Sequence, residues 1–244
     1  MALIFKGGAV FLHVPKTGGN WVTDVLRRSN LVDRTVGGEQ ENKHLTMDCL
    51  LANPVQLLEN KRVFGGIFGK AGAGKHKPFM FCFVRNPLAW YESWFKYMSQ
   101  PTRYWRHCGD TRDVFGWHPC AGLNGLGDPT FSGFIRNVLR HRPGFVSELY
   151  ADFAKPHIDF IGRQESLRDD LVTVLRMLQV DFDEDFVRTY QEVGVSPKPD
   201  RPIEWEPDLR DQIIQTEQIA MVRYGYDGAA AVELADSVAD HKVN

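Results

Sequence analysis

Residues 9–28 read AVFLHVPKTGGNWVTDVLRR and change character twice along their length. The apolar, partly β-branched residues 9–14 predict a strand, and the breakers at 15–19 predict a tight loop. From Trp21 to Arg28 apolar residues recur at helical spacing, which predicts a helix. A buried parallel strand that leads through such a loop into a helix is the arrangement with which α/β proteins bind anions.

A second apolar run, FMFCFV at 79–84, is followed by Arg85-Asn86-Pro87. It predicts a strand buried on both faces, and Asn86-Pro87 predicts the start of a helix that continues over 88–98. A short strand at 159–161 and helices at 131–139, 167–178 and 208–224 are also expected. This alternation predicts an α/β protein with a mostly parallel central sheet flanked by helices on both faces, and the strand ends should converge on one site.

Composition limits the class of protein. With 244 residues, 43% hydrophobic and 25% charged, the chain fits a single globular domain over 1–244, with a loop or insertion at about 102–130 that could shape a substrate mouth. A formal charge of −2 without like-charge runs argues against a nucleic-acid partner. No stretch approaches the roughly 20 apolar residues of a membrane span, and the N-terminus shows no signal-peptide pattern. We therefore expect a cytoplasmic protein that does not insert into membranes.

The loop after the first strand carries donors suited to an anion. Its glycines allow close approach of the backbone, and its lysine, hydroxyl and amide add donors. The residues concerned are Lys16, Thr17, Gly18, Gly19, Asn20 and Trp21. A glycine turn with a solvated lysine explains a bare KTGG equally well. At the end of the second strand Arg85 offers a guanidinium fork, and Ser93, in the helix that follows, offers a hydroxyl. An arginine at a strand end is, however, more often solvated or ion-paired.

Taken together, the two segments resemble a known family. HVPKTGGNWV at 13–22 and FVRNPLAWYESW at 83–94 resemble, in order and character, the two nucleotide-binding motifs of sulfotransferases that use 3′-phosphoadenosine 5′-phosphosulfate (PAPS). The likeness is greatest to the branch that includes carbohydrate sulfotransferases and their bacterial relatives. Residues 161–167 and 221–226 also resemble family segments, so the likeness spans most of residues 9–226.

The resemblance implies a P-loop-like three-layer fold and transfer of a sulfuryl group to a hydroxyl or amine, with 3′-phosphoadenosine 5′-phosphate (PAP) as product and no required metal. Lys16 would contact the 5′-phosphosulfate and stabilise the departing phosphate, with residues 17–21 as the cradle. Arg85 and Ser93 would hold the 3′-phosphate, and Arg163 would face the nucleotide unless it forms an ordinary surface ion pair. The chain departs from the motifs at Asn20, where threonine is usual, and at Ala89 or Trp90, where arginine is frequent.

The general base and the acceptor are the least constrained parts of this interpretation. His44, which resembles a histidine segment between the two motifs, is the first candidate for the base, with a structural helix-entry histidine as the alternative. His13 is the second, with a core histidine as the alternative, and His118 and Glu165 follow. A small molecule or a carbohydrate is expected as acceptor. Tryptophans 90, 94, 105 and 117 could stack on a sugar, although such spacing more often indicates a core.

Three other hypotheses remain open. GKAGAGK at 69–75 matches the core of a Walker A loop, which would indicate an ATP- or GTP-dependent kinase-like enzyme. His76 stands where a serine or threonine should bind magnesium, and a strand follows instead of a helix, so a basic surface loop is preferred. A module that binds PAP or PAPS without catalysis is the second. The third is a zinc site built from His107, Cys108, His118 and Cys120, whose spacing matches no standard finger.

Overall fold

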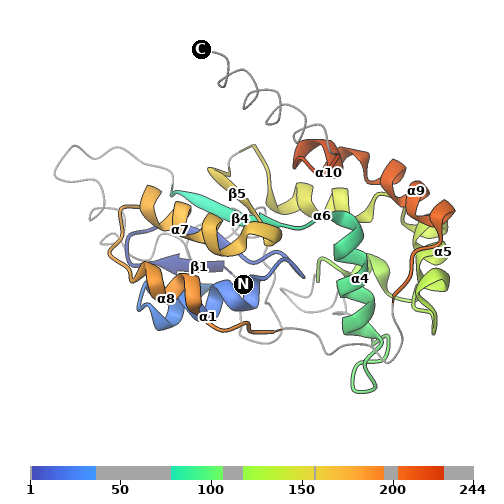
Figure 1. Ribbon diagram of the computed structural model, residues 1–244, viewed down its shortest axis with the longest axis horizontal. Helices are drawn as coiled ribbons and strands as arrows, with labels where there is room; N and C mark the ends of the chain where they lie inside the picture. Colours follow the sequence, from blue (N-terminus) through green and yellow to red (C-terminus); the bar gives the residue numbers. More distant parts are fainter. Residues whose placement is uncertain (1, 37–77, 107–117, 157, 195–202, 228–244) are drawn as a thin grey trace, which may run out of the picture. The chain divides into compact units, whose positions relative to one another are not determined.

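The computed structural model describes residues 2–36, 78–106, 118–156, 158–194 and 203–227 (Figure 1). These residues form two compact units. The first unit contains 2–36, 78–85, 118–121, 151–156 and 158–194, and the second contains 86–106, 122–150 and 203–227. Within the described ranges no helix has both the length and the apolar character needed to cross a bilayer. A single domain over the whole chain remains a prediction.

The first unit is built on a five-stranded sheet in the order β3-β1-β2-β4-β5. Its strands are β1 (Ala2–Phe5), β2 (Val10–Leu12), β3 (Val32–Val36), β4 (Met80–Val84) and β5 (Phe160–Arg163). β4 runs parallel to both β2 and β5, whereas β1 runs antiparallel to β2 and β3. The chain is therefore an α/β protein with a mixed sheet.

The expectation of a mostly parallel sheet holds for one side of the sheet only. β1 and β2 are joined by a tight turn in which the Gly8 backbone N–H donates to Phe5 O at 2.8 Å and Gly8 has φ 87°. A connection this short can only reverse the chain, because a parallel pair needs a crossover of a dozen or more residues. β3 then adds to the outer edge of β1. The three-layer, P-loop-like arrangement remains a prediction.

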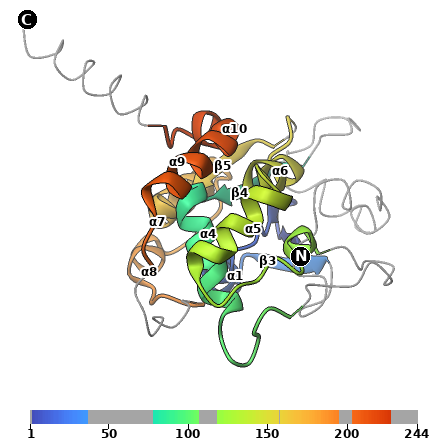
Figure 2. The same cartoon turned by 90° about the vertical axis from the view of Figure 1, so that its right-hand side faces the viewer.

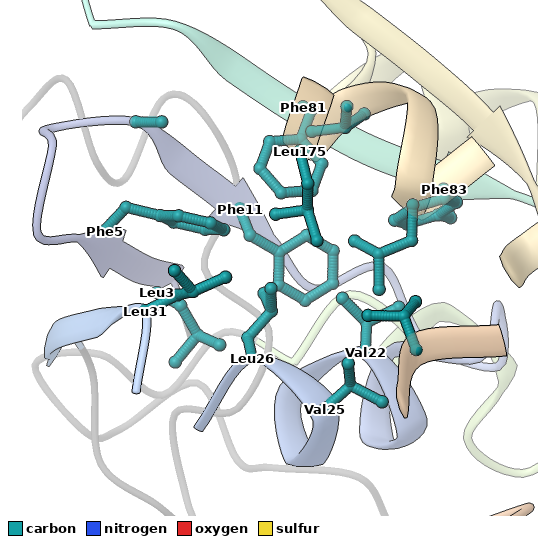
Figure 3. Close-up of a cluster of buried hydrophobic side chains, with 14 of the residues drawn as sticks. Leu3, Phe5, Phe11, Val22, Val25, Leu26, Leu31, Phe81, Phe83 and Leu175 are labelled. Atoms are coloured by element: carbon teal, nitrogen blue, oxygen red, sulfur yellow. The ribbon is translucent and has the colours of Figure 1, made fainter. Parts of the chain in front are cut away.

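Helices of the first unit cover one face of the sheet. They are α1 (Gly19–Arg28), α7 (Leu167–Met177) and α8 (Glu184–Thr189), with the short 3-10 turn η2 (Gln164–Ser166) before α7. Alternate strand side chains, all at most 1% exposed, meet these helices in the core drawn in Figure 3; they are Leu3, Phe5, Phe11, Phe81 and Phe83. The intervening strand residues, such as Leu12 and Cys82, are buried as well. This confirms the predicted strand buried on both faces for residues 80–84, whereas Phe79 precedes the strand and is half-buried.

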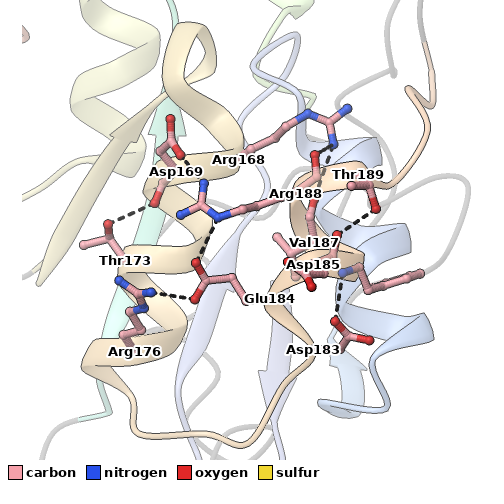
Figure 4. A network of polar contacts seen from close by, with 11 residues as sticks. Arg168, Asp169, Thr173, Arg176, Asp183, Glu184, Asp185, Val187, Arg188 and Thr189 are labelled. Atoms are coloured by element: carbon pink, nitrogen blue, oxygen red, sulfur yellow. Dashed lines mark hydrogen bonds and ion pairs between the residues drawn. The ribbon is translucent and has the colours of Figure 1, made fainter.

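A polar network links α8 to α7 (Figure 4). Arg188 bridges Asp169 and Glu184, and Arg176 also pairs with Glu184 at 2.6 Å. Arg168 donates from Nη1 to the backbone oxygens of residues 187 and 188 near the end of α8. Exposed ion pairs contribute little each. The packing of this short helix comes from the buried Val187 together with the partly buried Phe186, both of which contact the core of the first unit.

The second unit is helical. Its elements are α4 (Pro87–Met98), α5 (Phe131–His141), α9 (Pro207–Thr216) and α10 (Gln218–Arg223), and α6 (Phe145–Phe153) begins in it. In Figures 1 and 2, α4, α5 and α9 lie side by side. The Asn86 side chain accepts from the Leu88 N–H at 2.9 Å and Pro87 follows, which confirms the predicted helix start. In place of one closing helix, the chain forms two that meet at Glu217.

The described parts of the predicted 102–130 loop are irregular apart from the 3-10 turn η1 (Ala121–Leu123). The role of this segment as a substrate-side loop or insertion stays a prediction, and residues 107–117 lie outside the described residues. The expected helix entry at 44–51 lies outside the described residues.

Glu217 is a fully buried carboxylate that organises the second unit. It accepts from the Tyr91 hydroxyl at 2.6 Å, from the Val146 N–H at 3.0 Å, and from both the N–H and the hydroxyl of Ser147 at 2.7 Å. The two backbone donors belong to the first turn of α6, where a helix favours negative charge. Burial, with the negative charge of Glu217 second, holds the pKa of the Tyr91 hydroxyl well above its usual range.

We expect Glu217→Ala to lower the free energy of unfolding by about 3 to 5 kcal/mol, because two buried and two partly buried donors lose their acceptor at once. Urea denaturation followed by circular dichroism measures the loss. Glu204→Ala removes an exposed carboxylate of the same unit and should change the free energy by less than about 0.5 kcal/mol. Equal losses in the two variants would contradict the structural role of Glu217.

Candidate anion-binding site

Three neighbouring parallel strands of the first unit end at the same edge of the sheet. Leu12 of β2 lies opposite Cys82 of β4, and Val84 of β4 lies opposite Arg163 of β5. The loop containing Lys16 follows β2, and Arg85 follows β4 directly. Three cationic side chains therefore belong to one edge of one sheet, which is the edge at which α/β proteins bind their ligands.

The loop after β2 is held in an unusual conformation. Lys16 has φ 64° and Gly18 has φ 83°, so two residues near the end of one short loop are left-handed. Between them Thr17 is 1% exposed, and its hydroxyl donates to Val14 O at 3.1 Å. A left-handed lysine costs of order 1 kcal/mol, and such strain clusters at functional sites. The Thr17 hydroxyl uses its proton in this hydrogen bond. An anion in the loop would therefore be bound by the Thr17 backbone N–H and not by the hydroxyl.

Helix α1 begins with N–H groups suited to an anion. Gly18 is its N-cap and makes no side-chain cap hydrogen bond, and the first intrahelical bond runs from the Val22 N–H to Gly18 O at 3.2 Å. The N–H groups before Val22 therefore have no acceptor within the helix. The first turn carries no acidic residue, so the positive end of the helix dipole is not neutralised there.

Close packing fixes both glycines of the loop. A Cβ on Gly18 would lie 2.5 Å from Cδ2 of Leu167, and a Cβ on Gly19 would lie 2.1 Å from Cδ2 of His13. The sequence predicted that these glycines admit a ligand, but the neighbouring side chains, and φ 83° at Gly18, already disfavour a larger residue at either position. The loop is thus wedged between the end of β2 and the start of α7.

His13 occupies a structural position. Its side chain is 3% exposed, and its ring stacks on Phe11 with centroids 6.1 Å apart at 24°. The ring also packs against the backbone of Gly19. These contacts favour the core-histidine alternative. His44, the first candidate for the base, lies outside the described residues, so its role stays a prediction.

Asn20 and Trp21, at the start of α1, differ in burial. Asn20 is exposed, and its Nδ2 would lie 2.8 Å from a Cβ placed on Gly194. Trp21 is 4% exposed within the core of the first unit, with the Arg168 guanidinium 5.0 Å from its ring centroid. Trp21 could therefore contribute to an anion cradle through its backbone N–H, whereas the role predicted for the Asn20 amide stays a prediction.

The residues predicted to bind the 3′-phosphate and the nucleotide belong to two different units. Arg85 is half-buried and Arg163 is exposed, and both belong to the first unit with Lys16. Ser93 is half-buried in α4 of the second unit. The joint action of Arg85 and Ser93 on one phosphate remains a prediction.

His118 is poorly suited to act as a base or a metal ligand. Its Nδ1 accepts from the Cys120 backbone N–H at 3.1 Å, and burial lowers the pKa of the imidazole to about 4. The ring is therefore neutral at pH 7 with the Nδ1 lone pair in use. His107 and Cys108 lie outside the described residues, and the described residues contain no cluster of three or more metal-binding side chains.

The tryptophans of α4 belong to a core. Trp90 and Trp94 are 0% and 3% exposed, and their rings stack at 5.6 Å and 10°. Trp105 packs on Phe95 and Phe134 of the same unit. Stacking of a sugar on Trp90 or Trp94 is thus not favoured, and Trp117 lies outside the described residues.

Comparison with models of protein families gives no match, and a search of curated proteins finds no significant relative. The likeness to sulfotransferases therefore depends on the sequence motifs alone.

Lys16→Gly and Lys16→Ala remove the same charge but differ in backbone strain. Glycine adopts the left-handed conformation of this position freely, so Lys16→Gly should be more stable than Lys16→Ala by about 1 kcal/mol. Paired urea denaturation curves measure the difference. Lower stability of the glycine variant would show that the loop does not hold this backbone conformation in solution.

Proposed function

We propose that the chain is a sulfotransferase that moves a sulfuryl group from PAPS to a hydroxyl or amine of an acceptor. One observation carries the proposal. The first segment, 13–22, follows β2, and the start of the second, 83–85, ends the adjacent parallel strand β4, so Lys16 and Arg85 belong to the same edge of the sheet. A small-molecule or carbohydrate acceptor and a cytoplasmic location remain part of the proposal.

The residues at this edge fit the chemistry of the donor. PAPS carries anionic groups at both its 3′ and 5′ positions, and the edge supplies Lys16, Arg85 and the exposed Arg163. The start of α1 adds backbone donors without a competing acidic residue in its first turn. Lys16 would face the 5′-phosphosulfate and Arg85 the 3′-phosphate. Ser93 would assist Arg85.

In the proposed reaction the acceptor oxygen or nitrogen attacks sulfur, and the bond between sulfur and the bridging phosphate oxygen breaks. The positive charge of Lys16 and the first N–H groups of α1 compensate the negative charge that develops on that oxygen. The acceptor proton passes to a base, for which His44 remains the candidate. Lys16 and the helix start supply the positive charge, so the proposed step needs no metal ion.

The kinase-like alternative has less support. A Walker A loop leads directly into a helix that receives phosphates. Strand β4 begins at Met80, five residues after Lys75, and the loop itself lies outside the described residues. Transfer assays with PAPS alone, and with ATP and magnesium, separate the two functions.

We expect Lys16→Ala to reduce sulfuryl transfer from labelled PAPS by about 10²- to 10³-fold, because the departing phosphate loses its compensating charge. The wild-type chain is first screened against small-molecule and carbohydrate acceptors, and the variant is assayed on the best of them. Lys6→Ala is the matched control. Lys6 is an exposed lysine directly after β1. Because β1 runs antiparallel to β2, Lys6 lies at the end of the sheet where β2 begins, opposite to the end that carries the candidate site.

Full transfer in the Lys16 variant would overturn the proposed mechanism. A wild-type chain that binds PAP but transfers to no acceptor in the screen would favour the non-catalytic module.

Arg85→Ala should weaken PAP binding by about 10- to 100-fold, the effect expected for loss of a charged hydrogen-bonding partner. Calorimetry with PAP and with adenosine 5′-phosphate isolates the contribution of the 3′-phosphate. The variant should lose the preference of the wild type for PAP, whereas Arg140→Ala, an exposed arginine in α5, should keep it. An unchanged preference would exclude Arg85 from the 3′-phosphate site.

A further inference from the structure

Asp170 holds the turn that joins β5 to α7. It lies in the first turn of α7, and its Oδ2 accepts from the Arg163 backbone N–H at 2.6 Å and from the Ser166 hydroxyl at 2.7 Å. Ser166 is the N-cap of α7 but makes no side-chain cap hydrogen bond. Its hydroxyl is therefore used to close the turn.

This turn is pressed against the loop of the candidate site. A Cβ on Gly18 would lie 2.5 Å from Cδ2 of Leu167 and 3.6 Å from Cγ of Gln164. On the other side, a Cβ on Gly162 would lie 3.1 Å from Cβ of Asp170. A continuous series of contacts thus leads from Asp170 through the turn to Gly18, the N-cap of α1. A shift of residues 163–167 would move the side chains of Gln164 and Leu167 that lie beside Gly18.

The charge of Asp170 is unfavourable for an anion site. A carboxylate that is hydrogen-bonded to the backbone of Arg163, at the strand end where the site lies, repels an incoming phosphate within the Debye length. Its negative charge is favourable for the first turn of α7 itself. Asp170 would therefore support the neighbouring site through its two short hydrogen bonds and not through its charge.

We infer that Asp170 is a positioning residue for the anion-binding loop, acting through the 163–167 turn and Gly18. The inference rests on the proposed function for the identity of its ligand only. Both hydrogen bonds end on Oδ2, so a substitution can remove the charge of Asp170 and still keep a hydrogen-bond acceptor at that place. Asparagine keeps one such oxygen and carries no charge, whereas alanine loses oxygen and charge together.

The test compares Asp170→Asn, Asp170→Ala and Ser166→Ala with the wild type in two measurements. The first is calorimetric affinity for PAP. Asp170→Ala should bind PAP about tenfold more weakly. Asp170→Asn should bind at least as tightly as the wild type, because the turn is kept and the repulsive charge is gone. Ser166→Ala, which removes one of the two bonds, should fall between wild type and Asp170→Ala and remains informative if Asp170→Ala does not fold.

The second measurement is hydrogen–deuterium exchange of the backbone amides of residues 16–22 in the ligand-free chain. Protection should fall in Asp170→Ala and be retained in Asp170→Asn, with the amides of β1 unchanged in both. Equal losses in the alanine and asparagine variants, or no loss in either, would overturn the inference. If the wild type binds no PAP, the proposed function fails, and the exchange comparison still decides whether Asp170 positions the loop.

Discussion

The parallel pairing of β4 with β2 and with β5 is the constraint on which the candidate site depends. Hydrogen bonding in a parallel ladder fixes the level at which each strand ends, so the residues after the three strands must lie at one edge. Lys16, Arg85 and Arg163 are distant in sequence and share that edge for this reason alone. A shift of β4 by one residue would turn Phe81 and Phe83 away from the core beneath α1 and α7, so the core itself holds the register.

Within this frame the site combines features that would be costly elsewhere. Lys16 keeps a left-handed backbone, and α1 starts from a glycine cap without a side-chain acceptor. Each of these two features lowers the stability of the loop and of the helix start. The packed sheet can sustain such losses because β1, β2 and β4 are buried on both faces. A stable layer therefore carries a strained loop, which is the usual division between scaffold and functional segment.

The sequence predicted the elements whose signals are local. The runs at 9–14 and 79–84 stand between breakers, and Asn86-Pro87 is a cap followed by proline, so β2, β4 and the start of α4 could be inferred. β1 was missed although Lys6-Gly7-Gly8 after four apolar residues is a hairpin signal. Helix α6 was missed because FVSELYADF offers no clear polar face. The roles of Gly19 and Asp170 could not be predicted, since each depends on a neighbour that only the tertiary structure brings near.

The contacts around the two loop glycines also affect how a ligand would be received. His13 and Leu167 fill the space beside Gly19 and Gly18, and Thr17 is tied back to Val14. A loop wedged in this way has little freedom to rearrange, so induced fit has small scope within it. An anion would meet donors that are already oriented. Because the loop is ordered when the chain folds, binding would not be weakened by the entropy cost of ordering it.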